Sequence, residues 1–115
     1  MLEERVEGLK SYLNIDQKRI EIADEEALTQ DPTFWDDPKK AEVHLKKIRA
    51  KKVWTEAFDA VETALEDLKV LAEFFAEGEV EEVELDKQHA KCMEAIEELE
   101  RKRRSHRQAQ KQLAN

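Results

Sequence analysis

Apolar residues recur along most of the chain at alternating steps of four and three, which is the spacing of one face of an α-helix. Three stretches show this pattern, and we call each row of apolar residues a seam. The first seam consists of Leu2, Val6, Leu9, Leu13, Ile20, Ala23 and Ala27, with Asp16 as its polar member. The second consists of Trp54, Phe58, Val61, Leu65, Leu68, Ala72 and Phe75, preceded by Ala41, Leu45 and Ile48. The third consists of Leu85, His89, Cys92, Ile96 and Leu99, with Met93 beside it. The pattern predicts an all-α fold, either an antiparallel three-helix bundle or a long helical hairpin with a coiled-coil-like seam.

Interruptions of the pattern predict where the helices begin and end. Residues 14–16, Asn-Ile-Asp, favour caps over helix interiors, so two shorter helices are expected to meet near Asn14. A long helix is expected from Pro38 to about residue 76, with Asp37 as its N-cap and Gly78 just past its end. A further helix is expected from about Glu81 onward. The second seam changes phase between residues 48 and 54, which predicts local unwinding or a shifted contact.

A corner between two prolines contains the most distinctive short run of the chain. The run is Phe34, Trp35, Asp36, Asp37 and Pro38. We interpret it as a structural motif, in which the two large aromatic side chains plug one end of the core. On this interpretation Trp35 is well buried and contacts no ligand.

Composition narrows the class of protein. The 115 residues make one small domain, 42% of them are charged, and the formal net charge is −8. An acidic body repels phosphates, so a general nucleic-acid binder is not expected. No apolar run approaches the length of a membrane span, so no membrane association is expected. The lone Cys92 cannot form an internal disulfide, which favours a cytoplasmic location.

The sequence shows no pattern of catalytic, cofactor-binding or metal-binding residues. His89 and Cys92 are three residues apart, as two metal ligands could be, but a zinc site needs three or four ligands. We therefore interpret them as members of the third seam. The chain is expected not to be an enzyme, to use no cofactor and to hold no metal.

The segment 101–115 differs in charge from the rest, because it has six basic residues and no acidic one. Two interpretations stay open. Candidate phosphate contacts are Arg101, Lys102, Arg103 and Arg104. The alternative is that these cations only complement the dipole at a helix C-terminus. The alternative is favoured because no aromatic residue is interleaved with them for base stacking.

Particular runs of residues resemble a known family. These runs are residues 9–16 (Leu-Lys-Ser-Tyr-Leu-Asn-Ile-Asp), residues 18–22 (Lys-Arg-Ile-Glu-Ile) and residues 31–41 (Asp-Pro-Thr-Phe-Trp-Asp-Asp-Pro-Lys-Lys-Ala). They are similar to the N-terminal region of the bacterial peptide chain release factor 2 family. The Phe-Trp-Asp-Asp-Pro stretch is the most specific part, and the resemblance extends from about Leu2 to Glu100. Asn14 stands where members of the family usually have Asp.

The resemblance implies a function and a division of the chain. Residues 1–100 would be the family's N-terminal helical domain, and residues 101–115 a basic C-terminal tail of different character. In the family, which acts at UGA and UAA stop codons, later domains read the codon through a Ser-Pro-Phe motif and trigger peptidyl-tRNA hydrolysis through a Gly-Gly-Gln loop. Neither motif occurs in this sequence. The implied role is a ribosome-associated binding module of translation termination, docking at the large-subunit stalk base and near the partner GTPase release factor.

One alternative uses the same helices differently. A stand-alone helical adaptor or coiled-coil protein would pair its seam with a partner helix. The first helix is weakened at Gly8 and near Asn14, so it is expected to cover the apolar faces of the other two helices incompletely. A second copy of the chain could cover the rest, which suggests a weak homodimer that the acidic charge opposes.

Overall fold

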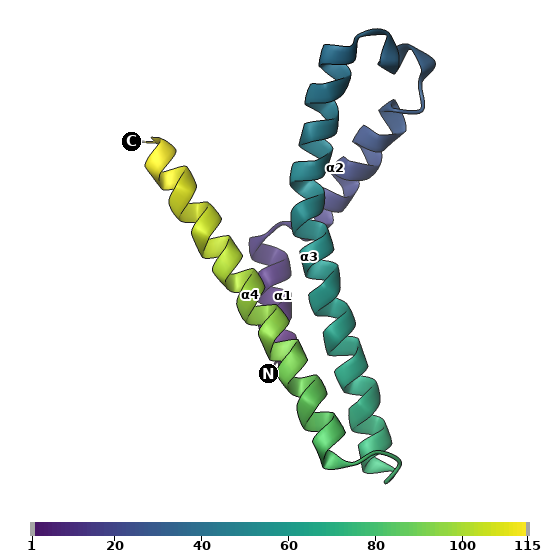
Figure 1. The fold of residues 1–115 in the computed structure, drawn as a ribbon, viewed down its shortest axis with the longest axis vertical. Coiled ribbons are helices and arrows are strands. Elements are labelled where there is room, and N and C mark those ends of the chain that lie inside the picture. The colour runs from purple at the N-terminus through teal and green to yellow at the C-terminus, as the bar shows by residue number, and fades with distance from the viewer. Residues whose placement is uncertain (1, 115) are drawn as a thin grey trace.

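The chain folds into four α-helices and one short 3₁₀ helix. The computed structural model describes the backbone of residues 2–114, and no strand occurs in that part of the chain. The elements are α1 (Leu2–Tyr12), α2 (Ile15–Leu28), η1 (Pro32–Asp36), α3 (Pro38–Ala76) and α4 (Glu82–Ala114). They form an elongated molecule of 60 × 40 × 18 Å (Figure 1). The predicted all-α class is confirmed.

Local capping explains where the longest helix begins and ends. The Asp37 side chain accepts a hydrogen bond from the Lys40 backbone N–H at 3.3 Å, and Pro38 occupies the first helical position. At the other end Gly78 adopts a positive φ of 76°. The N–H of Gly78 bonds to the Phe75 carbonyl and that of Glu79 to the Phe74 carbonyl, which is a Schellman motif. The predicted N-cap and C-terminal glycine are therefore confirmed.

Asn14 separates the first two helices, as predicted, and also redirects the buried face. It adopts left-handed backbone angles, φ 52° and ψ 48°, which asparagine tolerates better than most residues. Beyond this turn Ile15 and Ile22 are buried. Ile20, Ala23 and Ala27 are exposed, so the predicted continuation of the first seam through them is wrong. A left-handed residue rotates the helix that follows it, and a spacing rule carried across the turn cannot account for that rotation.

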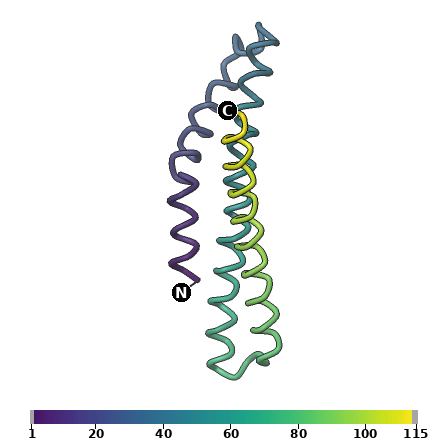
Figure 2. The backbone as a smooth tube through the Cα atoms, turned by 90° about the vertical axis from the view of Figure 1, so that its left-hand side faces the viewer, coloured from purple at the N-terminus to yellow at the C-terminus, as the bar shows by residue number. Residues whose placement is uncertain are grey.

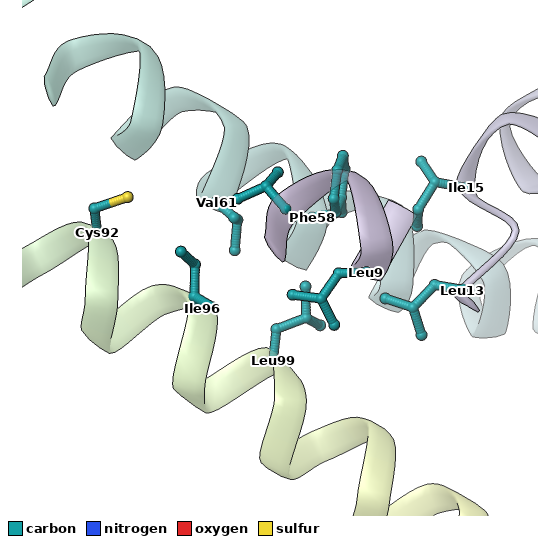
Figure 3. Packing of buried hydrophobic residues seen from close by; sticks show 9 residues of the cluster. Leu9, Leu13, Ile15, Phe58, Val61, Cys92, Ile96 and Leu99 are labelled. Carbon is teal, nitrogen blue, oxygen red and sulfur yellow. The ribbon is translucent and has the colours of Figure 1, made fainter. Parts of the chain in front are cut away.

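The core lies where α1, α3 and α4 come together, and we call this region the crossing. Its buried residues come from all three helices and from the α1–α2 turn: Val6, Leu9, Leu13, Ile15, Phe58, Val61, Cys92, Ile96 and Leu99. Figure 3 shows the labelled side chains of this cluster, all of them except Val6, pointing toward one another between the helices. Seen from the side, α1 lies to one side of the α3–α4 hairpin (Figure 2). Three helices therefore share a core only around the middle of the hairpin.

Above the crossing, α3 packs against α2 instead of α4, and we call α2, η1 and the first part of α3 (residues 15–55) the arm. Its buried α3 residues are Ala41, Ile48 and Thr55, spaced seven apart. The change of phase predicted between residues 48 and 54 is thus a shifted contact. The alternative of local unwinding is wrong, because α3 is continuously helical from Pro38 to Ala76.

Below the crossing several residues of the predicted seams are exposed to solvent. Ala72 is exposed and Phe75 is 40% exposed, although both belong to the predicted second seam. His89 is also exposed, so its interpretation as a buried member of the third seam is wrong. The neighbouring Gln88 faces α3 in its place and donates a hydrogen bond from Nε2 to the Ala64 carbonyl at 3.0 Å.

Beyond Leu99, α4 diverges from α3 and gives the molecule a forked outline (Figure 1). Leu113 near its end is 87% exposed, as expected for a helix that has nothing to pack against. The helix continues without a break past residue 100. The proposed division at residues 100 and 101 therefore falls inside α4 and stays a prediction.

Candidate interaction surfaces

The candidate residues for metal or nucleophilic chemistry do not form a site. Cys92 is fully buried in the core, and burial raises the pKa of its thiol. His89 lies on the exposed side of the same helix. Among residues 2–114 no group of three or more His, Cys, Asp or Glu side chains is placed to hold a metal ion. No helix in this range is long and apolar enough to cross a membrane.

The corner between the two prolines lies at the far end of the arm and is largely exposed. The Trp35 ring packs edge-on against Phe34 with 4.9 Å between ring centroids, and Phe34 packs in the same way on His44. Trp35 Nε1 donates a hydrogen bond to the Thr29 carbonyl at 3.2 Å. Yet Trp35 is 54% exposed, so the prediction of a buried plug is wrong. The corner lies beyond the last layer of core side chains, and the aromatic rings brace the turn itself.

The lower part of the molecule is a strongly acidic hairpin. Residues 54–100 contain sixteen acidic and three basic residues, and we call them the acidic hairpin. At its closed end four large apolar side chains are 40–52% exposed: Val70, Phe74, Phe75 and Val83. The connection between Phe75 and Val83 contains the carboxylates of Glu77, Glu79 and Glu81. Exposed apolar side chains with carboxylates close by in sequence suit a partner that has apolar and basic groups.

The basic stretch of α4 behaves differently, because the fold brings aromatic rings to it. The guanidinium of Arg103 lies over the Tyr12 ring at 4.1 Å from the centroid, and the Lys102 ammonium lies over Trp54 at 5.3 Å. His106 packs edge-on against the same Trp54 ring at 5.2 Å. The helix-dipole interpretation depends on the absence of aromatic residues interleaved with the cations in sequence. That premise is wrong in three dimensions, since α1 and α3 supply the rings.

An ion pair fixes the base of this stretch. Arg5 of α1 donates two hydrogen bonds to Glu100 of α4, at 2.6 and 3.0 Å. The hydrogen bond from Arg5 holds the pKa of the Glu100 carboxyl below its ordinary value, and the charges of Arg104 and Arg103 act in the same direction. The nearest carboxylate to the basic stretch is therefore already paired.

The four candidate phosphate contacts separate into two kinds. Lys102 and Arg103 are engaged with aromatic rings, and Arg101 and Arg104 are exposed. Two further basic residues on the exposed side, Arg107 and Lys111, lie on the same continuous helix. The sequence pattern assigns this role to neither Tyr12 nor Trp54. No local signal could have done so, because both lie far from residues 101–104 in sequence.

Comparison with known proteins identifies one kind of relative. The chain is 31% identical over 83 residues to peptide chain release factor 2 of Staphylococcus saprophyticus. This alignment covers 72% of the chain and 22% of the relative. It is 32% identical over 95 residues to the protein of the same name from Acidithiobacillus ferrooxidans, covering 83% of this chain and 24% of the relative. The protein of that name from Proteus mirabilis is 30% identical over 79 residues. No protein-family model matches the chain, and no solved structure matches it significantly.

These matches cover most of this chain but only a small part of each relative. The chain spans between a fifth and a quarter of the length of the relatives that it matches. The resemblance to release factor 2 that the residues suggested is thereby confirmed, for a segment of that protein.

Proposed function

We propose, from this similarity to part of peptide chain release factor 2, that the chain is the N-terminal helical module of a translation termination factor and binds the ribosome. The observation that carries the proposal is that five relatives match most of this chain, and all have the same name. By the same similarity, the whole factor acts at UGA and UAA codons in the cytoplasm. The module docks at the large-subunit stalk base, near a partner GTPase release factor.

The closed end of the acidic hairpin is the part of the module best suited to that docking. Phe74 and Phe75 are 41% and 40% exposed at the end of the α3–α4 hairpin, and neither belongs to the core cluster at the crossing. The carboxylates close by in sequence complement basic proteins, and ribosomal proteins are commonly basic. The hairpin holds this patch far from the forked end of the molecule (Figure 1).

Sedimentation with purified ribosomal particles tests the proposal. The chain is expected to pellet with large subunits and with whole ribosomes, but not with small subunits alone. The double variant Phe74→Ser/Phe75→Ser is expected to lose most of this binding. A matched control, Ile20→Ser/Leu28→Ser, removes two similarly exposed apolar side chains from the arm and is expected to bind as the parent does. Absence of pelleting at low and moderate salt would overturn the proposal.

Peptide release is not expected from these residues alone. The sequence contains neither a Ser-Pro-Phe nor a Gly-Gly-Gln motif, and hydrolysis needs a group placed at the peptidyl-transferase centre. In a release assay on ribosomes programmed with a stop codon, the chain should give only background hydrolysis. Stop-dependent release above background would contradict this.

A second candidate function also uses the hairpin end. The four exposed apolar side chains there suit a partner helix, as in a stand-alone helical adaptor, or a second copy of the chain in a weak homodimer. Sedimentation equilibrium measures the homodimer directly. Screening of like charges by moderate salt should strengthen it, and a monomer at hundreds of micromolar would exclude it.

A further inference from the structure

The exposed basic face of α4 takes no part in the core or in the docking proposed for the hairpin end. We propose that this face, together with Tyr12 of α1, binds single-stranded RNA. The inference stands on residues at and beyond the crossing, and it does not depend on the proposed function.

Three exposed cations form a row on this face. Arg104, Arg107 and Lys111 follow one another at steps of three and four, which places them on one side of the helix. None of the three forms an ion pair with the described residues. Residues 101–115 contain no acidic group that could neutralise them. A row of unpaired cations along about 10 Å of helix is suited to successive phosphates of one strand.

The acidic hairpin does not cancel this row. Its nearest carboxylate, Glu100, is bound by Arg5. Arg104 is the cation closest to the carboxylates: its charge acts on Glu100, and Glu98 lies six residues, about 9 Å, before it. Arg107 and Lys111 lie nine and thirteen residues beyond Glu98, about 14 and 20 Å along the helix axis. At physiological ionic strength these two separations exceed the screening length of about 8 Å. The cations therefore act locally although the whole chain has a net charge of −8.

Tyr12 adds a platform for an unpaired base. Its side chain is 69% exposed although the Arg103 guanidinium covers part of the ring at 4.1 Å. Arginine over an aromatic ring forms a stacked surface at which nucleobases pack. A base within a duplex is already stacked and paired, whereas an unpaired base is free to reach the ring. The combination of a cation row and an exposed ring favours a single strand over a duplex.

A second copy of the chain is the competing occupant, because its acidic hairpin also complements a basic face. One feature favours RNA over it. An exposed tyrosine beside the cation row gives a base a stacking partner, while a carboxylate gains nothing from it.

Fluorescence anisotropy of a labelled oligouridylate of about twelve nucleotides, titrated with the full chain, tests the proposal. Three phosphate contacts predict that the logarithm of the binding constant falls with the logarithm of salt concentration at a slope of about −2. The variant Arg104→Gln/Arg107→Gln/Lys111→Gln should bind at least tenfold more weakly. The control Lys39→Gln/Lys40→Gln/Lys47→Gln loses the same charge from exposed positions on the arm and should bind within about twofold of the parent.

Tyr12 is tested in the same assay. Tyr12→Ala should weaken binding about fivefold or more, and Tyr12→Phe, which keeps the ring, should restore it. A duplex RNA of equal length should bind more weakly than the single strand.

Four outcomes would overturn the proposal. They are no binding at low salt, equal losses in the two glutamine variants, unchanged binding of Tyr12→Ala, and equal affinity for the duplex. The basic face would instead bind a second copy of the chain if three results were found together. The parent would sediment as an oligomer, the Arg104/Arg107/Lys111 variant would be a monomer, and the parent would not bind RNA.

Discussion

The crossing and the arm lie on the same helix α3, but they are held together by different forces. At the crossing three helices contribute side chains, and Phe58, Val61, Cys92 and Ile96 are less than 2% exposed. In the arm α3 packs mainly against α2 and η1, with contacts to α4 only at Trp54, and four residues are buried outside the central cluster: Ile22, Ala41, Ile48 and Thr55. Two helices can bury only one stripe each, whereas a third helix closes the remaining side of the core.

Ion pairs between α2 and α3 accompany the smaller apolar contact in the arm. Lys51 pairs with Glu21 at 3.3 Å and with Glu25, and Lys52 pairs with Glu26 at 3.0 Å. The hydrogen bond to Glu25 is the main cause of the raised pKa of Lys51. Such pairs set the register of α2 on α3, but they are weakened by salt and add little net stability. We therefore expect the crossing to provide most of the stability of the fold and the arm to provide less.

The largest expected effect contrasts one residue of each region. Phe58→Ala should reduce the free energy of unfolding by about 3–5 kcal/mol, because it empties a fully buried site between three helices. Ile48→Ala, on the arm, should cost about 2 kcal/mol, since α2 alone can relax onto the smaller side chain. Urea denaturation followed by circular dichroism measures both values. Equal losses would mean that the arm is as tightly packed as the crossing.

A smaller effect is expected at the end of the arm. Trp35→Ala should cost about 1–2 kcal/mol, because the ring is 54% exposed and only part of its area leaves water on folding. Trp35→Phe keeps a smaller aromatic ring but removes the hydrogen bond to Thr29, and serves as the control. The same denaturation experiment applies. A loss above about 3 kcal/mol would show that the corner is an integral part of the core.

The turn that joins the two regions should respond to its backbone conformation alone. Asn14→Ala places a side chain that disfavours positive φ at 52°, and should cost about 1 kcal/mol. Asn14→Gly should be neutral or slightly stabilising, because glycine adopts this conformation freely. Thermal unfolding midpoints of the parent and the two variants measure these effects. If both substitutions had the same effect, the left-handed turn would not be what matters at this position.

The smallest effect concerns the ion pair at the crossing and depends on pH. Glu100 has a lowered pKa in the folded chain, so its stabilising contribution is complete above the ordinary value of 4.5 and is lost as pH falls through the lower folded value. Glu100→Gln should therefore cost about 0.5–1 kcal/mol near neutral pH. The difference from the parent should shrink progressively below 4.5. Denaturation at a series of pH values measures it, and a difference independent of pH would exclude the ionised pair as its source.

The helices and most of their end points can be predicted from local sequence. Asp37, Pro38 and Gly78 act on backbone groups within four residues of themselves, and the helix between them has the predicted bounds. Asn14 marked the break between α1 and α2 for the same reason. The resemblance to release factor 2 was also readable from short runs, because it depends on residue identity alone.

Which face of each helix is buried depends on how the helices cross, and local sequence does not specify that. Spacing places Ile20 and Phe75 on the same helix faces as residues that are buried. It does not show that these two positions have no neighbouring helix to cover them, and both are exposed. The pairing of Tyr12 with Arg103 and of Trp54 with Lys102 was equally out of reach. Periodicity describes one helix at a time, whereas burial and long-range contacts depend on the crossing of several helices, and that crossing follows from the turn at Asn14 and the length of α3.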